Sequence, residues 1–97
     1  MTGGGNTFSG PARIVTTDRT FTVQAELVVW SYGGKVHWGG FVTTDTRAEA
    51  VAATEDPYPV IELGEETFPF RAALRTARSG GLLALTGLGP SPLGDPA

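Results

Sequence analysis

The alternating stretch over residues 21–29 and the two glycines that follow it constrain the fold more than any other feature. Apolar side chains occupy every second position from Phe21 to Val29, and mostly polar side chains stand between them. A period of two is typical of a half-buried strand in an antiparallel sheet. Gly33 and Gly34 come soon afterwards, and adjacent glycines readily take the positive φ angles of a two-residue hairpin turn. The sequence therefore predicts a β-hairpin whose second strand spans residues 35–44.

A two-residue turn also sets the register of this hairpin. It pairs Trp30 with His37 and Val29 with Trp38, so Trp38 joins the alternating apolar face. The opposite face begins polar and becomes aromatic toward the turn. It carries Glu26, Val28, Trp30, Tyr32, His37 and Phe41. Both faces of the hairpin are therefore apolar near the turn.

His37 is the only histidine of the chain, and three interpretations of its face are open. In the first, a helix or the N-terminal arm covers the face, and His37 is a packed residue with a satisfied ring nitrogen. In the second, the face contacts a second copy or another protein, because exposed aromatic patches usually mark contact surfaces. In the third, one face of the hairpin lines a ligand cavity, and His37 or Glu26 acts on the ligand.

The rest of the chain is mostly strand-like. Runs of β-branched and aromatic residues predict strands before a polar turn at residues 17–20 and over residues 58–63, 67–77 and 82–88. Further turns are expected at residues 64–65 and 79–81. The Ala-rich residues 47–53 favour a short helix, with Thr44 or Asp45 as its cap and Pro57 as its stop.

Three residues that weaken strands carry additional information. Pro69 lies inside a predicted strand, which indicates a sheet edge or a bulge at that point. Gly39 and Gly40 lie inside another, where they usually mark a bulge, a barrel corner or a close approach by another group.

These elements predict an all-β fold with one short helix, in the order strand–strand–strand–helix–strand–strand–strand. The 97 residues suffice for a single small domain, with a loose arm over residues 1–9 and an irregular tail over residues 90–97. A small six-stranded antiparallel barrel uses such short strands best, because closure removes exposed edges. A strongly curled sheet that dimerises along an edge is the alternative.

Composition excludes several classes of function. The chain has no cysteine and one histidine, so neither a disulfide nor an ordinary zinc site can form, and we expect no metal and no cofactor. The net charge is −3 and no basic cluster is visible, which argues against nucleic-acid binding. No apolar run is long enough for a membrane span, and no secretory signal is visible. We therefore expect the cytoplasm as the compartment.

Three stretches, residues 10–15, 33–42 and 83–93, resemble a domain family of unknown function from actinobacteria, some of whose members are fused to flavin-dependent monooxygenases. That family shows a Gly-Pro-Ala opening, a His-Trp followed by a Gly, and a closing Gly-x-Gly with prolines. In this chain the His-Trp element is His37, Trp38 and Gly40, and the closing element is Gly87, Gly89 and Pro92. Where the family usually has a bulky aromatic and an Arg, this chain has Gly39 and Phe41. A charge is lost, and space beside His37 is expected.

The context of this family, oxidative and specialised metabolism, implies a small apolar organic ligand. We expect a barrel that binds a hydrophobic natural-product intermediate and promotes a cofactor-independent cyclisation or isomerisation, which needs a dry shaped pocket and one proton donor or acceptor. His37 would supply the proton chemistry, with Glu26 assisting. The ligand-binding residues would be Trp30, Trp38, Phe41, Tyr32 and Gly39. The alternative is a non-catalytic accessory or dimerisation module of a flavin-dependent monooxygenase, and a homodimer is expected in either case.

Overall fold

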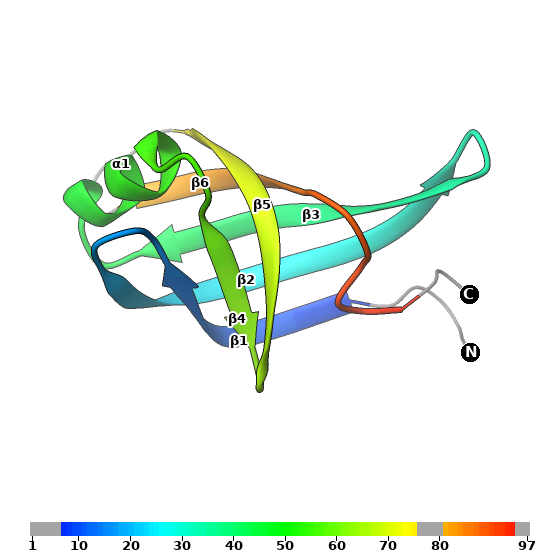
Figure 1. Cartoon of the computed structure of the whole chain (residues 1–97), viewed down its shortest axis with the longest axis horizontal. Coiled ribbons are helices and arrows are strands. Elements are labelled where there is room, and N and C mark those ends of the chain that lie inside the picture. Colours follow the sequence, from blue (N-terminus) through cyan, green and yellow to red (C-terminus); the bar gives the residue numbers. More distant parts are fainter. Residues whose placement is uncertain (1–6, 76–80, 95–97) are drawn as a thin grey trace.

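Six antiparallel strands close into a barrel, and one helix interrupts their succession (Figure 1). In chain order the elements are β1 (Thr7–Val15), β2 (Thr20–Tyr32), β3 (Lys35–Thr44), α1 (Arg47–Glu55), β4 (Val60–Leu63), β5 (Glu66–Leu74) and β6 (Gly81–Gly87). Around the barrel the strand order is β1-β2-β3-β6-β5-β4. This computed structural model describes residues 7–75 and 81–94. It confirms the predicted fold class and order of elements, and it has the closed barrel rather than the curled sheet.

The register of the β2–β3 hairpin is the predicted one. Trp30 pairs with His37 and Val29 with Trp38, and the ladder ends at the pair nearest the turn, Tyr32 with Lys35. The two turn glycines have φ angles of 62° and 78°. These angles lie in the left-handed region, where a side chain is disfavoured, so the glycine pair determines both the turn and the faces of the two strands.

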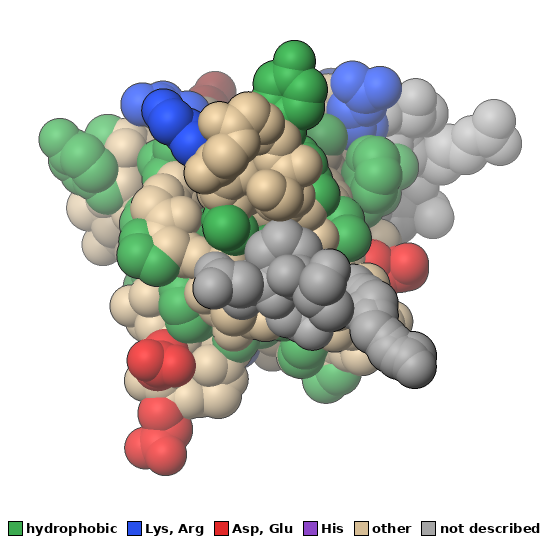
Figure 2. Space-filling view, turned by 90° about the vertical axis from the view of Figure 1, so that its right-hand side faces the viewer, with side chains coloured by type: hydrophobic (Ala, Val, Ile, Leu, Met, Phe, Trp, Pro, Cys, Tyr) green, Lys and Arg blue, Asp and Glu red, His purple; other side chains and the backbone are tan. Residues whose placement is uncertain are grey.

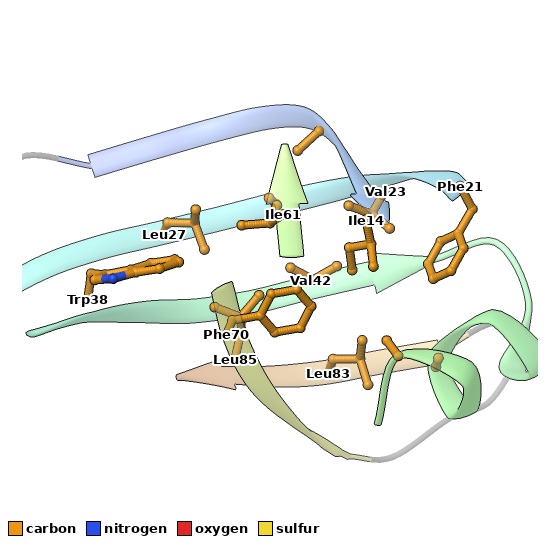
Figure 3. Close-up of a cluster of buried hydrophobic side chains, with 14 of the residues drawn as sticks. Ile14, Phe21, Val23, Leu27, Trp38, Val42, Ile61, Phe70, Leu83 and Leu85 are labelled. Carbon is orange, nitrogen blue, oxygen red and sulfur yellow. The ribbon is translucent and has the colours of Figure 1, made fainter. Parts of the chain in front are cut away.

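The core lies inside the barrel, where all six strands contribute apolar side chains (Figure 3). The alternating residues of β2 line one wall, from Phe21 near α1 to Val29 near the hairpin. The largest fully buried side chains are Trp38, Phe70, Ile14, Ile61, Leu83 and Val42. Each contributes roughly 1.5–3 kcal/mol through removal of apolar surface from water. The interior of the barrel is therefore packed with side chains.

Helix α1 begins with a capping box. Thr46 Oγ1 accepts a hydrogen bond from the backbone N–H of Glu49 at 3.1 Å, and Glu49 Oε1 accepts one from the N–H of Thr46 at 3.3 Å. The prediction of Thr44 or Asp45 as the cap is wrong. Thr44 is the last residue of β3, and its hydroxyl donates to the Thr46 carbonyl at 2.6 Å, which holds the start of the helix against the barrel.

The buried side of α1 is made of small residues and packs on the sheet. Ala50 and Ala53 are its buried positions. A Cβ atom at Gly81, the first residue of β6, would lie 2.2 Å from the Cβ of Ala50. Glycine at this position therefore allows the helix to lie directly on the sheet.

Strand β5 changes its pairing partner at Pro69. Residues 66–69 pair with β4, whereas pairing with β6 begins at Phe70. Pro69 has no N–H to donate, and its carbonyl accepts a hydrogen bond from Leu88 N at 3.0 Å. The sequence predicted an edge or a bulge at this proline, and in the structure the ladder between β5 and β6 ends at the adjacent pair, Phe70 with Gly87.

The chain ends differ in part from the prediction. Residues 7–9, which the sequence assigned to a loose arm, start β1, because β2 is long enough to pair with them. Three predicted parts of the chain lie outside the described residues. They are residues 1–6 of the arm, the turn at residues 79–80 and the last three residues of the tail. Residues 88–94 form no helix or strand, and the side chain of Leu93 packs against the core. Within the described ranges, no helix has the length and apolar character needed to cross a membrane.

Candidate functional site

The β2–β3 hairpin extends beyond the body of the barrel (Figure 1). β1 pairs with β2 as far as Val28, and β6 pairs with β3 only from Gly39 onward. Within the part of the chain that the structure describes, residues 29–38 therefore pair only with one another. An isolated two-stranded hairpin is marginally stable in water. The side chains on its two faces must supply the additional contacts that hold it.

The outer face of this hairpin is aromatic and exposed. Trp30 is 43% exposed, Tyr32 78% and Phe41 53%. His37 is half-buried, and its ring stacks on Trp30 with centroids 5.9 Å apart and an interplanar angle of 21°. We call Val28, Trp30, Tyr32, His37 and Phe41 the outer hairpin face. The helix does not cover this face as the first interpretation allowed, because α1 packs against β3, β5 and β6 at the other end of the barrel. The other cover named there, the N-terminal arm, lies largely outside the described residues.

Trp38 lies on the opposite side of the sheet from these residues. It is 1% exposed and closes the end of the core away from α1 (Figure 3). Phe68 meets it edge-on at 6.2 Å, and a Cβ at Gly87 would lie 1.9 Å from the indole ring. Its Nε1 has no hydrogen-bond partner among the described residues. Trp38 therefore belongs to the barrel interior, and the sheet separates it from Trp30.

The paired glycines of β3 fill a packing role. A Cβ at Gly39 would lie 2.3 Å from the carbonyl oxygen of Leu85, and a Cβ at Gly40 would lie 2.0 Å from that of Glu26. The backbones of the neighbouring strands thus approach both positions, as one of the predicted alternatives required. The expected space beside His37 is not there, because the backbone of β6 occupies the position of a Gly39 side chain.

Glu26 and His37 share the outer face without forming a pair. Glu26 pairs with Phe41 and His37 with Trp30, so their levels on β2 are four positions apart. At about 3.3 Å per residue this is roughly 13 Å along the strand. Neither side chain makes a hydrogen bond within the described residues. The structure does not assemble the two expected catalytic groups into a proton-transfer pair.

A cavity lies beneath the C-terminal end of α1. It is a cavity of about 250 Å³ between the helix, the following loop and the start of the β5–β6 pairing. Its lining includes three prolines, Tyr58, Phe70 and Arg71. Sequence reasoning missed it, since its residues come from three separate segments, 53–60, 69–72 and 88. The visible signal is that Pro57 and Pro59 precede β4 and that Pro69 lies within the neighbouring strand β5.

On the far side of α1, a broader and more open groove of about 810 Å³ runs between the helix and the turn from β1 to β2. In residues 7–75 and 81–94, no group of three His, Cys, Asp or Glu side chains is arranged to hold a metal ion.

Comparison with known proteins adds no assignment. No family model, no curated protein and no solved structure matches the chain.

Proposed function

We propose that the chain is a non-catalytic interaction module that pairs with a second copy of itself through the outer hairpin face. The observation that carries this proposal is the concentration of apolar surface on one hairpin. Of the seven large hydrophobic side chains that are exposed in the described chain, four lie on the outer hairpin face, and a fifth, Val36, lies on the opposite face of the same hairpin. The largest apolar patch on a typical monomer is of this order of size and is often a functional contact surface.

The exposed area is sufficient for a modest dimer. With about 200 Å² for a whole aromatic side chain, the exposed fractions of Trp30, Tyr32 and Phe41 amount to roughly 350 Å². A two-fold pair covers this surface on both copies, roughly 700 Å², and the polar rim adds to it. This is below the roughly 1,200 Å² at which standard specific interfaces begin, so we expect a weak, transient dimer with a dissociation constant in the micromolar range.

Charge complementarity favours a second copy as the occupant. Lys35 pairs with Tyr32 at the tip of the hairpin, and Glu26 lies at its base on the same face. About 20 Å of strand separates the two charges. When two hairpins pack face to face in antiparallel orientation, the two-fold axis brings each Lys35 next to Glu26 of the partner subunit. The aromatic side chains then meet between two equivalent ion pairs.

The interior and the spacing of the polar groups support a non-catalytic role. The barrel is packed with core side chains, and Glu26 lies two outward-facing positions away from the level of His37. The resemblance described above supplies an expected context, in which such a module accompanies a flavin-dependent monooxygenase.

Sedimentation equilibrium across the micromolar range tests this function with paired variants. Lys35→Glu and Glu26→Lys are each expected to weaken the dimer by roughly threefold, the range for an exposed ion pair, and the double variant should restore it. Arg75→Glu makes the same charge change outside the hairpin and is the matched control. Trp30→Ser should weaken the dimer by roughly tenfold or more, whereas Tyr58→Ser should not. A monomer mass at several hundred micromolar would refute the proposal.

A second candidate is the binding of a hydrophobic natural-product intermediate on the same face, followed by cofactor-independent cyclisation or isomerisation. The position of the single imidazole favours it, since His37 stacks on Trp30 beside exposed aromatic side chains. The ligand would stack on Trp30, Tyr32 and Phe41, and His37 would donate or accept one proton. Loss of product formation in His37→Gln at an unchanged melting temperature would support this candidate, and unchanged turnover would contradict it.

A further inference from the structure

The cavity beneath α1 is lined by groups that suit a specific chemical class of ligand. Its lining residues are Ala53, Thr54, Asp56, Pro57, Tyr58, Pro59, Val60, Pro69, Phe70, Arg71, Ala72 and Leu88. Most of them are apolar, and Phe70, fully buried in the core, forms part of the lining. The volume of about 250 Å³ is slightly below that of sites for drug-sized molecules. A molecule with a single ring or a short branched chain is therefore of suitable size.

The walls of this cavity are held in place by backbone hydrogen bonds. Phe70 N donates to the carbonyl of Pro59 at 3.2 Å, and Leu88 N donates to that of Pro69 at 3.0 Å. These bonds join the loop after α1 to β5, and β5 to the segment after β6. Prolines have a fixed φ, so the loop loses little freedom when a ligand binds. The cavity is preformed, which reduces the cost of binding.

The carboxylate of Asp56 holds the same loop through two hydrogen bonds from backbone N–H groups. Its Oδ1 accepts a hydrogen bond from Thr17 N at 2.8 Å, and its Oδ2 accepts one from Tyr58 N at 3.0 Å. The Thr17 N–H, followed by smaller contributions that include the Tyr58 N–H, lowers the pKa of this carboxyl group. Asp56 is the one carboxylate among the described lining residues, and both of its oxygens accept hydrogen bonds from backbone N–H groups.

Among the described residues of the lining, Arg71 is the one cationic side chain. It is exposed, and within the described residues its guanidinium makes no ion pair or hydrogen bond. A guanidinium offers a rigid fork of donors that matches a carboxylate. The described lining therefore combines an apolar, proline-walled body with one anion-binding group that has no partner among the described residues.

The geometry points to a binding site for a small apolar carboxylic acid, whose carboxylate pairs with Arg71 and whose ring or chain lies among the prolines and Phe70. This site is on β5 and the loop after α1, apart from the outer hairpin face. Its occupation does not depend on dimerisation, so the two proposals can fail separately.

Titration of the ¹⁵N-labelled full chain with phenylacetate, followed by amide chemical shifts, tests this site. Saturable shifts are expected at Thr54, Tyr58 and Leu88, while the amides of Trp30 and His37 remain in place. The neutral analogue 2-phenylethanol and the cationic analogue phenethylamine are titrated in parallel. Phenylacetate should bind more tightly than either. Equal affinity for the neutral analogue, tighter binding of the amine, or shifts confined to the hairpin would each overturn the proposal.

Two arginine variants distinguish specific binding of the carboxylate by Arg71 from the loss of any positive charge on this part of the surface. Arg71→Gln should weaken phenylacetate binding by roughly tenfold, as expected for loss of a charge-assisted contact, and leave 2-phenylethanol binding unchanged. Arg75→Gln removes a cation near the end of the same strand and should have no effect on either ligand. Equal effects of the two substitutions would refute a specific role for Arg71. Both arginine side chains are exposed, so neither substitution should change the thermal unfolding transition, and an unchanged transition serves as the folding control.

Discussion

Gly87→Ala tests the packing of Trp38 inside the barrel. The added Cβ would lie 1.9, 2.2 and 2.3 Å from three atoms of the indole ring. Trp38 is 1% exposed and therefore has no route out of the core. Overpacking of a well-packed core typically costs 1–3 kcal/mol, and because three rigid ring atoms clash at once we expect the upper end, about 3 kcal/mol.

Equilibrium urea unfolding measures this loss, and Gly64→Ala is the matched control. Gly64 has φ of 66° and nothing within 4 Å of its Cβ position. Its substitution costs only the left-handed backbone strain, about 1–2 kcal/mol. Gly87 has no such backbone strain, so the whole effect at Gly87 is steric. Gly87→Ala should therefore be the more destabilising of the two.

A double variant identifies Trp38 as the group that clashes. Trp38→Phe removes the larger ring and an Nε1–H that has no acceptor among the described residues, so the loss of packing is partly offset by removal of this donor. In the Trp38→Phe background, Gly87→Ala should cost at least about 1.5 kcal/mol less than in the parent. Strictly additive effects, or a Gly87→Ala variant within about 0.5 kcal/mol of the parent, would refute the reasoning.

Three further expectations concern the helix cap, acid stability and the histidine. Thr46→Ala should lower the free energy of unfolding by about 1 kcal/mol through loss of the capping box, and Thr46→Ser should retain most of it in the same urea assay. Because the Thr17 N–H lowers the folded-state pKa of Asp56, this carboxylate adds stability above its unfolded pKa of about 3.9, and that stability is lost as pH falls through the lowered pKa. Melting temperatures measured at neutral and acidic pH should therefore differ less in Asp56→Asn than in the parent. His37→Gln removes only one exposed-face stacking contact and should cost under about 1 kcal/mol, which calorimetry will check; a larger loss would show that the ring is a structural residue.

The fold was accessible from sequence because its signals are local. The alternation in β2 and the glycine pair at the turn are both properties of neighbouring residues, and together they determine the register and the faces. The helix cap was missed because Thr46 and its neighbours all have the right chemistry, and the choice among them depends on where β3 ends. That end is set by pairing with β6, which is distant in the sequence.

The candidate sites were less accessible, for physical reasons. The sequence places Trp30, Tyr32, His37 and Phe41 on one face, but whether another element covers them depends on the position of α1. The space expected at Gly39 is occupied by the Leu85 backbone, a contact between strands that no local pattern encodes. The cavity beneath α1 is assembled from three segments, and neither proline spacing nor the arginine in its lining predicts how they meet.

The change of partner at Pro69 has a consequence for how the barrel is held together. β1 and β2 pair over nine residues, as do β2 and β3, whereas β4 is joined to β1 through three pairs and to β5 through four. The barrel is thus a long continuous sheet that is closed by one short strand, β4. Local opening begins where the fewest hydrogen bonds hold the structure, so β4 loses its pairing before the rest of the sheet unfolds. The amide hydrogens of Val60–Leu63 will therefore exchange with solvent ahead of those in the middle of β2. For the same reason, β4 is the strand that two copies of the chain exchange most easily in a domain swap.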